Sequence, residues 1–326
     1  MIISQTPLRI SFAGGGTDMS KFYKKFPGAV VSSTINKYIY ITVNKKFDNL
    51  IRASYSKTEF AKHPDKIKHE LIRESLKHVG IYSGLEITSI SDIPSGTGLG
   101  SSSSYTVGLL NALNAYRGIY SSQKDLASDA CDIEIKRCHK PIGKQDQYAT
   151  AFGGLNFIEF NQNGDINVSP IIIKPKKVAE LEENLLLMYM GNTRSADKVL
   201  NDQLKQLSKN PDCFIHLKTM ADLARSLNKS LSHNDIDQFG EILDQNWQLK
   251  RKLSEQISNP HIDNWYKIAK KNGAIGGKVL GAGGGGFLLI YAPSSKHAKI
   301  IKALPKLIPT PFSFEGFGSR IVYYQH

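Results

Sequence analysis

The chain has 326 residues, 40% of them hydrophobic, and a formal net charge of +13. Its mean hydropathy of −0.28 and the lack of any apolar run near ~20 residues exclude a helical membrane protein. Three cysteines are too few for a disulfide framework. The N-terminus lacks a secretory signal pattern, so we expect a cytoplasmic protein. The scattered lysines favour an anionic small ligand or a solvated surface over a nucleic-acid platform.

Hydrophobic periodicity divides the first half of the chain into strands and helices. We expect strands over residues 4–14, 29–47 and 83–93, and helices over residues 64–79, 104–117 and 121–138. Ser122 is the expected N-cap of the last helix. After it, residues 153–173 resemble a hairpin with Asn163-Gly164 as its turn.

The character of the sequence changes near residue 180. A buried apolar strand leads there into a long helical region, which contains little strand until residues 276–293. That segment predicts a strand, a glycine turn and a second strand, followed by a helix over 294–307 and a closing strand over 319–326. We therefore predict two domains, residues 1–180 and residues 181–326.

A glycine- and serine-rich segment, PSGTGLGSSSS at residues 94–104, joins a predicted strand to a predicted helix. Glycine lets the backbone turn its N–H groups inward, and the helix N-terminus adds unpaired donors and a positive dipole end. The glycine-rich loop and the helix N-terminus together predict an anion-binding site. An ordinary glycine-rich turn is the competing interpretation, because the segment has neither the Gly-Lys-Ser/Thr of a Walker loop nor the GxGxxG of a dinucleotide fold.

Three motifs together resemble those of the GHMP small-molecule kinases. The segment at 94–104 matches the PxxxGLGSSxx phosphate loop of that family, PLRISFAGGGTD at residues 7–18 matches its first motif, and KVLGAGGGGF at residues 278–287 matches its third. The resemblance covers essentially the whole chain. It implies an α+β fold, with a mixed-sheet N-terminal domain that binds ATP, a ferredoxin-like C-terminal domain, and a substrate groove between them.

Within that family the first motif looks most like that of sugar-1-kinases acting on D-glycero-D-manno-heptose 7-phosphate. Galactokinases carry Glu-His where this chain has Gly15-Gly16, which leaves room for a bulkier sugar and argues against galactose. The resemblance implies phosphorylation of the anomeric hydroxyl to a 1,7-bisphosphate for nucleotide-activated heptose synthesis. The alternatives are a kinase of an unphosphorylated sugar such as fucose or galactose, a non-catalytic nucleotide or sugar sensor, and, from charge alone, a nucleic-acid-binding protein.

The resemblance also implies roles for single residues. Asp146 is the expected acceptor of the sugar proton, and Arg9 keeps it ionised. Ser102 and Glu134 are the expected ligands of Mg²⁺. Each of these residues also has a purely structural interpretation. Arg9 could be a surface charge at a strand end, Ser102 could cap the helix, and Glu134 could be an exposed glutamate paired with Lys136 or Arg137. The expected ATP-binding residues are Pro94, Ser95, Gly96, Thr97, Gly98, Leu99, Gly100, Ser101, Ser102 and Ser103.

For the sugar, the resemblance makes Asp18 the acceptor of hydroxyl hydrogen bonds, although Asp18 could instead cap a short helix that follows it. A phosphorylated sugar needs a second anion site, for which Arg194 is the first candidate, followed by Lys198 and Arg52. The oligomeric state and the anomer are left open. The expected substrate-binding residues are Gly15, Gly16, Thr17, Asp18, Arg194, Gly283 and Gly284.

Overall fold

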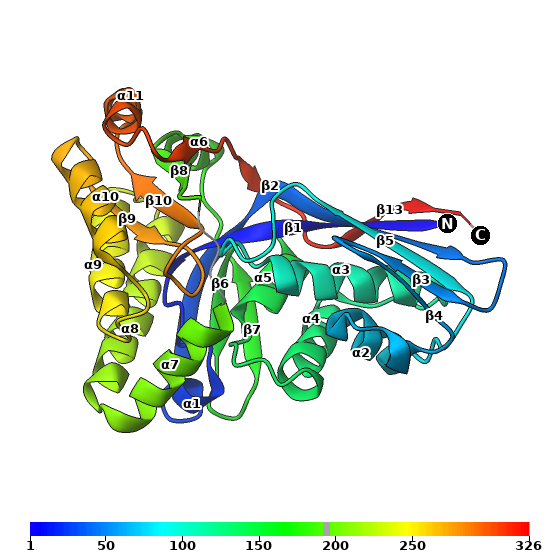
Figure 1. The fold of residues 1–326 in the computed structure, drawn as a ribbon. Helices are drawn as coiled ribbons and strands as arrows, with labels where there is room; N and C mark the ends of the chain where they lie inside the picture. The colour runs from blue at the N-terminus through cyan, green and yellow to red at the C-terminus, as the bar shows by residue number, and fades with distance from the viewer. Residues whose placement is uncertain (192–195, 326) are drawn as a thin grey trace.

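The computed structural model describes residues 1–191 and 196–325. This part of the chain forms a large sheet at one end of the molecule and a smaller sheet at the other, each packed with helices (Figure 1). Within these residues, no helix combines the length and the apolar character needed to cross a membrane.

The larger sheet has nine strands and is mixed. β1 and β2 form a long antiparallel pair that places Arg9 opposite Thr34, whereas β3 and β5 run parallel. The main path is β13-β1-β2-β5-β3-β4, while β6 and β12 pair with β2, and β7 pairs with β6. Its strands are β1 (Ile2–Ala13), β2 (Gly28–Lys45), β3 (Ile51–Ser54), β4 (Thr58–Ala61), β5 (Leu85–Ser91), β6 (Leu155–Phe160), β7 (Ile166–Pro170), β12 (Phe314–Glu315) and β13 (Arg320–Tyr324).

A layer of helices lies along one face of this sheet (Figure 1). They are α2 (Glu70–Val79), α3 (Ser101–Tyr116), α4 (Gln123–Cys131) and α5 (Gln145–Phe152), with α1 (Ser20–Tyr23) and the 3₁₀ turn η1 (Pro64–Lys66) as shorter elements. Ser122 caps α4 as predicted, in a reciprocal capping box with Asp125. The predicted helix over 121–138 does not continue as α-helix, because Asp132–Arg137 form the π-helical segment η2. Such segments are rare and occur often at functional sites.

The smaller sheet is antiparallel with the order β11-β8-β10-β9. In chain order its strands are β8, β9, β10 and β11. Four helices connect β8 to β9, and a fifth precedes β11. In the sheet, the first strand of the chain order lies between the fourth and the third, as in ferredoxin-like folds. The α+β fold with a mixed sheet and a ferredoxin-like unit is thus confirmed. The elements are α6 (Pro175–Glu183), β8 (Leu185–Tyr189), α7 (Ala196–Lys209), α8 (Asp212–Ser232), α9 (Phe239–Arg251), α10 (Pro260–Lys271), β9 (Gly276–Val279), β10 (Phe287–Tyr291), α11 (Ser294–Ala303) and β11 (Ile308–Pro309).

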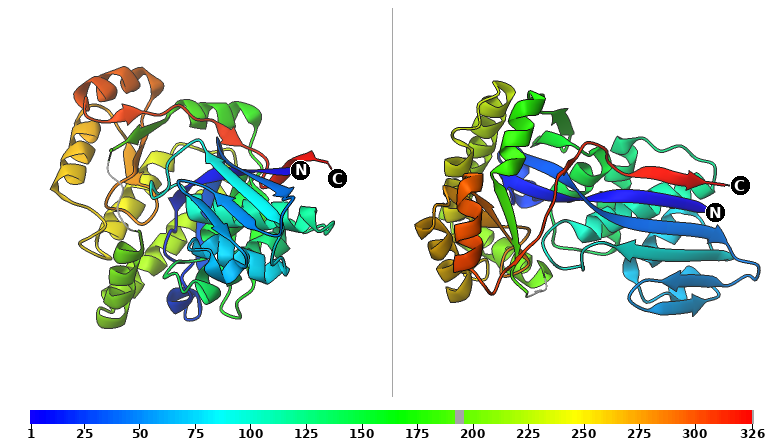
Figure 2. Two further views of the ribbon diagram at one scale, coloured as in Figure 1. Left: turned by 45° about the vertical axis from the view of Figure 1, so that its right-hand side comes forward. Right: turned by 90° about the horizontal axis from the view of Figure 1, so that it is seen from above.

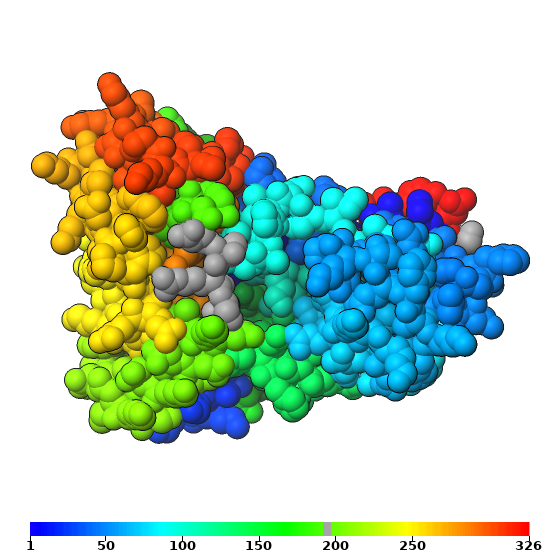
Figure 3. All heavy atoms as spheres, in the orientation of Figure 1, coloured from blue at the N-terminus to red at the C-terminus, as the bar shows by residue number. Residues whose placement is uncertain are grey.

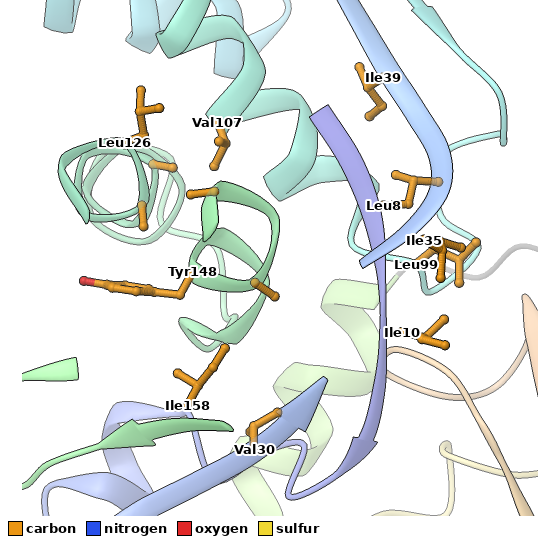
Figure 4. Close-up of a cluster of buried hydrophobic side chains, with 14 of the residues drawn as sticks. Leu8, Ile10, Val30, Ile35, Ile39, Leu99, Val107, Leu126, Tyr148 and Ile158 are labelled. Atoms are coloured by element: carbon orange, nitrogen blue, oxygen red, sulfur yellow. The ribbon is translucent and has the colours of Figure 1, made fainter. Parts of the chain in front are cut away.

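The core of the larger unit forms where the helices meet the long strands (Figure 4). Leu8 and Ile10 of β1 are fully buried, as are Leu99 at the end of the glycine-rich loop and Val107 of α3. Full burial of one such side chain contributes about 1.5–3 kcal/mol. The strand that carries the first motif is therefore held in place by the buried residues that precede and follow Arg9 in the sequence.

The last two strands lie with the first sheet. β13 pairs with β1, and β12 pairs with β2, and both chain ends lie close together at that edge (Figure 2). The Met1 ammonium donates to the Gln325 carbonyl oxygen at 2.7 Å. This arrangement differs from the expected second domain of residues 181–326, because the tail after β11 returns to the first unit. The boundary near residue 180 itself stays a prediction.

Candidate active site

The three glycine-rich motifs line one cavity between the two units, with a volume of about 220 Å³. The space-filling view shows this face hollowed between the yellow-green helices of the second unit and the teal elements of the first (Figure 3). The cavity is lined by Arg9, Gly15, Gly16 and Asp18 from the first motif, by Gly96, Gly98, Gly100, Ser101, Ser102 and Ser103 from the second, by Gly281, Ala282, Gly283 and Gly285 from the third, and by Asp146 and Lys250 among others.

Arg9 and Asp146 form a bidentate ion pair in this cavity. Arg9 Nε donates to Asp146 Oδ1 at 2.7 Å, and a terminal nitrogen donates to Oδ2 at 2.6 Å. The Arg9 residue is 3% exposed, so it is not a surface charge, whereas the Asp146 side chain keeps 25% of its surface. Such fork-to-fork contacts are short, strong and geometrically specific. The pair thus presents an oriented carboxylate to the cavity.

The glycine-rich loop is tied to the same arginine. A second Arg9 terminal nitrogen donates to the Gly98 carbonyl oxygen at 2.8 Å, and the Arg9 backbone N–H donates to the Leu99 carbonyl oxygen at 3.0 Å. Gly98 has a φ of +84°, and a Cβ there would lie 2.4 Å from the Leu280 carbonyl oxygen. The loop therefore needs glycine for its conformation and for its close contact with the third motif.

Ser102 and Glu134 meet at the N-terminus of α3. Ser102 Oγ donates to Glu134 Oε1 at 2.5 Å, while Oε2 accepts from Ser103 Oγ at 2.7 Å and from Gln147 Nε2 at 2.6 Å. Gly100, not a serine side chain, occupies the cap position of α3. Lys136 and Arg137 pair with Asp132 instead of Glu134. The cap and the surface-pair interpretations of these two residues are therefore wrong.

Glu134 is a buried carboxylate that, among the described residues, pairs with no cation. Burial raises its pKa, while the hydrogen bonds from Ser102, Ser103 and Gln147 act in the opposite direction. Oε1 accepts only one of these bonds, so it retains lone-pair capacity beside the hydroxyl of Ser102, an exposed residue. One carboxylate and one hydroxyl fit a magnesium ion that keeps its waters and phosphate ligands. No cluster of three or more His, Cys, Asp or Glu suited to a metal occurs in the described chain.

Asp18 is buried and does not cap α1, whose cap position is Met19. Its carboxylate accepts from the Gly16 N–H at 2.9 Å and from the Gln145 N–H at 3.1 Å. Burial raises its pKa, and the bond from the Gln145 N–H opposes that effect. Asp18 is thereby fixed next to the residue that precedes Asp146.

Several cavity residues carry no sequence signal that assigns them a role: Ser11 lies inside the first motif, whereas Lys250, Gln145 and Gln203 are isolated polar side chains. Lys250 of α9 is 6% exposed and donates to the Gly281 carbonyl oxygen. Ser11 Oγ, Gln145 Oε1 and Gln203 Nε2 are buried atoms without a hydrogen-bond partner among the described residues, and all three side chains line the cavity. Unpaired buried polar groups are costly and rare. These atoms are therefore suited to contact hydroxyl groups of a bound ligand.

A second pocket, of about 910 Å³, adjoins the first and shares Gly96, Ser101, Ser102 and Lys140 with it. Its walls include Ile39, Ile93 and Tyr105, and they lie beside the opening of the glycine-rich loop. The two pockets together join a space with both apolar and polar walls to the N-terminus of α3.

Some predicted site residues lie away from the cavity lining. Thr17 is fully buried, and its Oγ1 donates to the carbonyl oxygens of Gly14 and Ala29. Gly284 donates its N–H to the Ile257 carbonyl oxygen. Pro94 and Ser95 line only the second pocket, while Thr97 and Leu99 are buried beneath the loop. Arg52 pairs with Glu86 on β5. Arg194 lies outside the described residues.

Comparison with known proteins agrees with the motifs. Residues 66–154 match the N-terminal domain of the GHMP kinases, and residues 226–309 match their C-terminal domain. A D-glycero-alpha-D-manno-heptose 7-phosphate kinase from Campylobacter jejuni is 33% identical over 320 residues, or 94% of this chain and 93% of that protein.

Two solved structures are similar over nearly their whole length. A D-glycero-D-manno-heptose 1-phosphate kinase from Bacteroides thetaiotaomicron has a TM-score of 0.82 at 25% identity and covers 100% of both chains. A candidate sugar kinase from Campylobacter jejuni has a TM-score of 0.78 at 30% identity, covering 98% of this chain and 97% of that one. With three motifs around one cavity and matches to both domains, the chain belongs to the GHMP kinase family.

Proposed function

We propose that this chain is an ATP-dependent sugar kinase that phosphorylates the anomeric hydroxyl of D-glycero-D-manno-heptose 7-phosphate to the 1,7-bisphosphate. The observation that carries the proposal is the Arg9–Asp146 pair, which shares one cavity with the glycine-rich loop. The 33% identity to a heptose 7-phosphate kinase supports the substrate class. Sugar, ATP and Mg²⁺ are the small molecules that this reaction requires.

In this mechanism Asp146 accepts the proton of the anomeric hydroxyl as its oxygen attacks the γ-phosphorus. A sugar hydroxyl is a poor nucleophile near neutral pH, so a positioned base increases the rate. Arg9 holds the carboxylate in one orientation through two hydrogen bonds, and its charge stabilises the ionised form. Asp18, fixed by the N–H groups of Gly16 and Gln145, accepts hydrogen bonds from neighbouring sugar hydroxyls.

The glycine-rich loop and the start of α3 bind the phosphates of ATP, and the larger pocket receives the nucleoside. Backbone N–H groups at a helix N-terminus are suited to phosphate because they are unpaired and lie at the positive end of the dipole. Ser102 and Glu134 would hold Mg²⁺. When bound, Mg²⁺ neutralises charge on the phosphate oxygens.

A first prediction concerns the far phosphate of the sugar. Heptose 7-phosphate should be a far better substrate than free heptose, because losing a charge-assisted contact costs roughly 1.5–3 kcal/mol, or about ten- to a hundredfold. Much of the loss should appear in kcat/KM, since remote binding energy positions the reacting hydroxyl. ADP release measured with both sugars tests this.

Two controls make that test specific. Arg194→Ala narrows the gap between the two sugars if that residue holds the phosphate, and leaves it unchanged otherwise. Heptose 1-phosphate, whose anomeric oxygen is blocked, should be inert. Equal efficiency for free and phosphorylated heptose would instead favour a kinase of unphosphorylated sugars, and activity on heptose 1-phosphate would move the reaction to another hydroxyl.

A second prediction concerns Gln203, whose buried Nε2 has no partner among the described residues. If it donates to a sugar hydroxyl, Gln203→Leu should raise the sugar KM by about two- to tenfold, the value of one neutral hydrogen bond. The free protein should keep or gain thermal stability, because an unpaired donor is removed. Gln206→Leu, one helical turn away and outside the cavity lining, is the matched control. An unchanged KM would exclude Gln203 from sugar binding.

The alternative function from another class is a non-catalytic nucleotide or sugar sensor, which would bind both ligands without transferring phosphate. The described chain retains Arg9, Asp18, Glu134 and Asp146 in one connected site, which a sensor would not require. A chain that binds ATP and sugar phosphate with no transfer, by calorimetry and ADP release together, would replace the kinase with the sensor.

A further inference from the structure

Lys250 is a buried cation that the mechanism above does not use. It belongs to α9 of the second unit, lines the cavity and is 6% exposed. Its ammonium donates to the Gly281 carbonyl oxygen. Of the ion pairs found in residues 1–191 and 196–325, none includes Lys250.

The surroundings of this ammonium place it at the reacting end of the cavity. Its acceptor, Gly281, packs against the glycine-rich loop so closely that a Cβ there would lie 2.5 Å from the Gly98 Cα. Gly98 in turn accepts a hydrogen bond from Arg9, which holds Asp146. Lys250 of the second unit therefore lies at the same end of the cavity as the glycine-rich loop and Asp146 of the first unit.

Charged groups from several elements face Lys250. Arg9 of β1 repels its charge, while Asp18 and Asp146 attract it. On the neighbouring strand β9, burial together with the charges of Lys250 and Arg9 lowers the pKa of Lys278 well below its usual value. Both carboxylates already accept other hydrogen bonds, from Arg9 to Asp146 and from Gly16 and Gln145 to Asp18. Arg9 is engaged by Asp146, and both carboxylates already accept hydrogen bonds, so the Lys250 ammonium leaves this end of the cavity able to accept a further anion.

A comparison with Lys278 separates a structural lysine from a ligand-binding one. Lys278 is 1% exposed and donates to two carbonyl oxygens, those of Ser11 at 2.6 Å and Phe12 at 3.2 Å, which ties β9 to β1. Lys250 has three donor hydrogens and one carbonyl acceptor among the described residues. Burying an ammonium without an anion or enough acceptors is unfavourable, so its remaining donors are available to a ligand.

We propose that Lys250 binds oxygen atoms of the phosphoryl group during its transfer, an inference that rests on the proposed kinase function. In that step the bond between the γ-phosphorus and the bridging oxygen of ADP breaks, and a bond from the anomeric oxygen forms. The sugar proton passes to Asp146. Lys250 keeps its protons and stabilises the charge on the oxygens of the group in transfer, which is the usual role of cations in phosphoryl transfer.

The ionisation of this lysine gives the proposal a distinctive signature. Burial lowers the pKa of Lys250 to about 8, with Arg9 adding to the effect and Asp18 and Asp146 opposing it. The charged form is therefore present below pH 8 and lost above it. The activity that depends on Lys250 should fall as the pH rises through that region, and a bound phosphate should move the fall to higher pH.

The experiment compares wild type, Lys250→Met, Lys250→Arg and the exposed control Lys252→Met on the full chain, with ATP and heptose 7-phosphate. We expect Lys250→Met to lose roughly a hundred- to a thousandfold in kcat, as on removal of one transition-state donor. The alkaline fall of kcat/KM should disappear in this variant. Lys250→Arg should recover part of the rate without an alkaline fall, because arginine stays protonated. Lys252→Met should match wild type in rate and pH profile.

Three results would overturn the proposal. If Lys250→Met has a normal kcat, or if Lys250→Arg keeps the wild-type alkaline fall, Lys250 does not act on the phosphoryl group. If the loss vanishes with free heptose as substrate, Lys250 binds the far phosphate of the sugar instead. The arginine variant keeps the test decisive if the methionine variant does not fold. A wild-type chain that transfers no phosphate to any sugar would refute the proposed function itself, which these comparisons distinguish from failure of Lys250 alone.

Discussion

Asp146→Asn is expected to bind ATP and the sugar but to lose most of its turnover. Asparagine preserves the shape but offers the charged Arg9 guanidinium one neutral oxygen in place of the two carboxylate oxygens that it contacts at 2.6–2.7 Å. It cannot accept the sugar proton, and loss of a positioned base costs roughly 10²- to 10⁴-fold. Single-turnover rates with saturating substrates, combined with calorimetric binding of each substrate, would measure the effect.

The control for this variant is Asp222→Asn, which removes another arginine-paired carboxylate. Asp222 lies on α8 and pairs with Arg225 at 2.9 Å, with 59% of its side chain exposed. It should change neither rate nor affinity, since exposed pairs contribute little. Near wild-type turnover in Asp146→Asn would leave catalysis to positioning and electrostatic stabilisation alone.

Glu134→Gln is expected to raise the Mg²⁺ concentration needed for half-maximal rate, by roughly ten- to a hundredfold. The carboxylate accepts three hydrogen bonds in a buried site, and the amide nitrogen of glutamine would face at least one of these donors. Removal of the charge also weakens attraction for a hard cation. Ser102→Ala should show a smaller shift, because a hydroxyl is a neutral ligand.

Asp132→Asn is the matched control for the metal prediction. Asp132 lies two residues away on the same π-helical segment, but it pairs with Lys136 and Arg137. Its Mg²⁺ dependence should equal that of wild type, with thermal stability recorded for all four proteins. If Glu134→Gln and Ser102→Ala both retain the wild-type Mg²⁺ dependence, the metal is held elsewhere.

The sequence allows prediction of those site residues whose chemistry forces a recognisable pattern. Positive φ values and close backbone contacts demand glycine, so the loop around Gly98 and the third motif can be recognised in the sequence by their glycines. Arg9 and Asp18 stand within such a motif. Lys250 and Gln203 come from helices in a long helical region, where one lysine or glutamine resembles any other. Only the packing of α7 and α9 against the loops brings them to the cavity.

The same reasoning applies to the fold. Long strands with β-branched residues, such as β2, and the asparagine-glycine hairpin were predictable from local pattern. Strands β11 and β12 are two residues long, too short for a period to show. The pairing of β13 with β1 depends on residues from opposite ends of the chain, and hydrophobic periodicity carries no information about which strands become neighbours.

That pairing between β13 and β1 has a consequence for biosynthesis. β13 covers Ile2–Gln5 of β1, and this stretch of edge remains open until residues 320–324 have left the ribosome and docked. An uncovered strand edge is a template for pairing with other chains, and contacts so distant in sequence form slowly. Completion of this edge of the larger sheet is therefore a late step. A nascent chain stalled near β11 would leave this edge of β1 open to pairing with other chains.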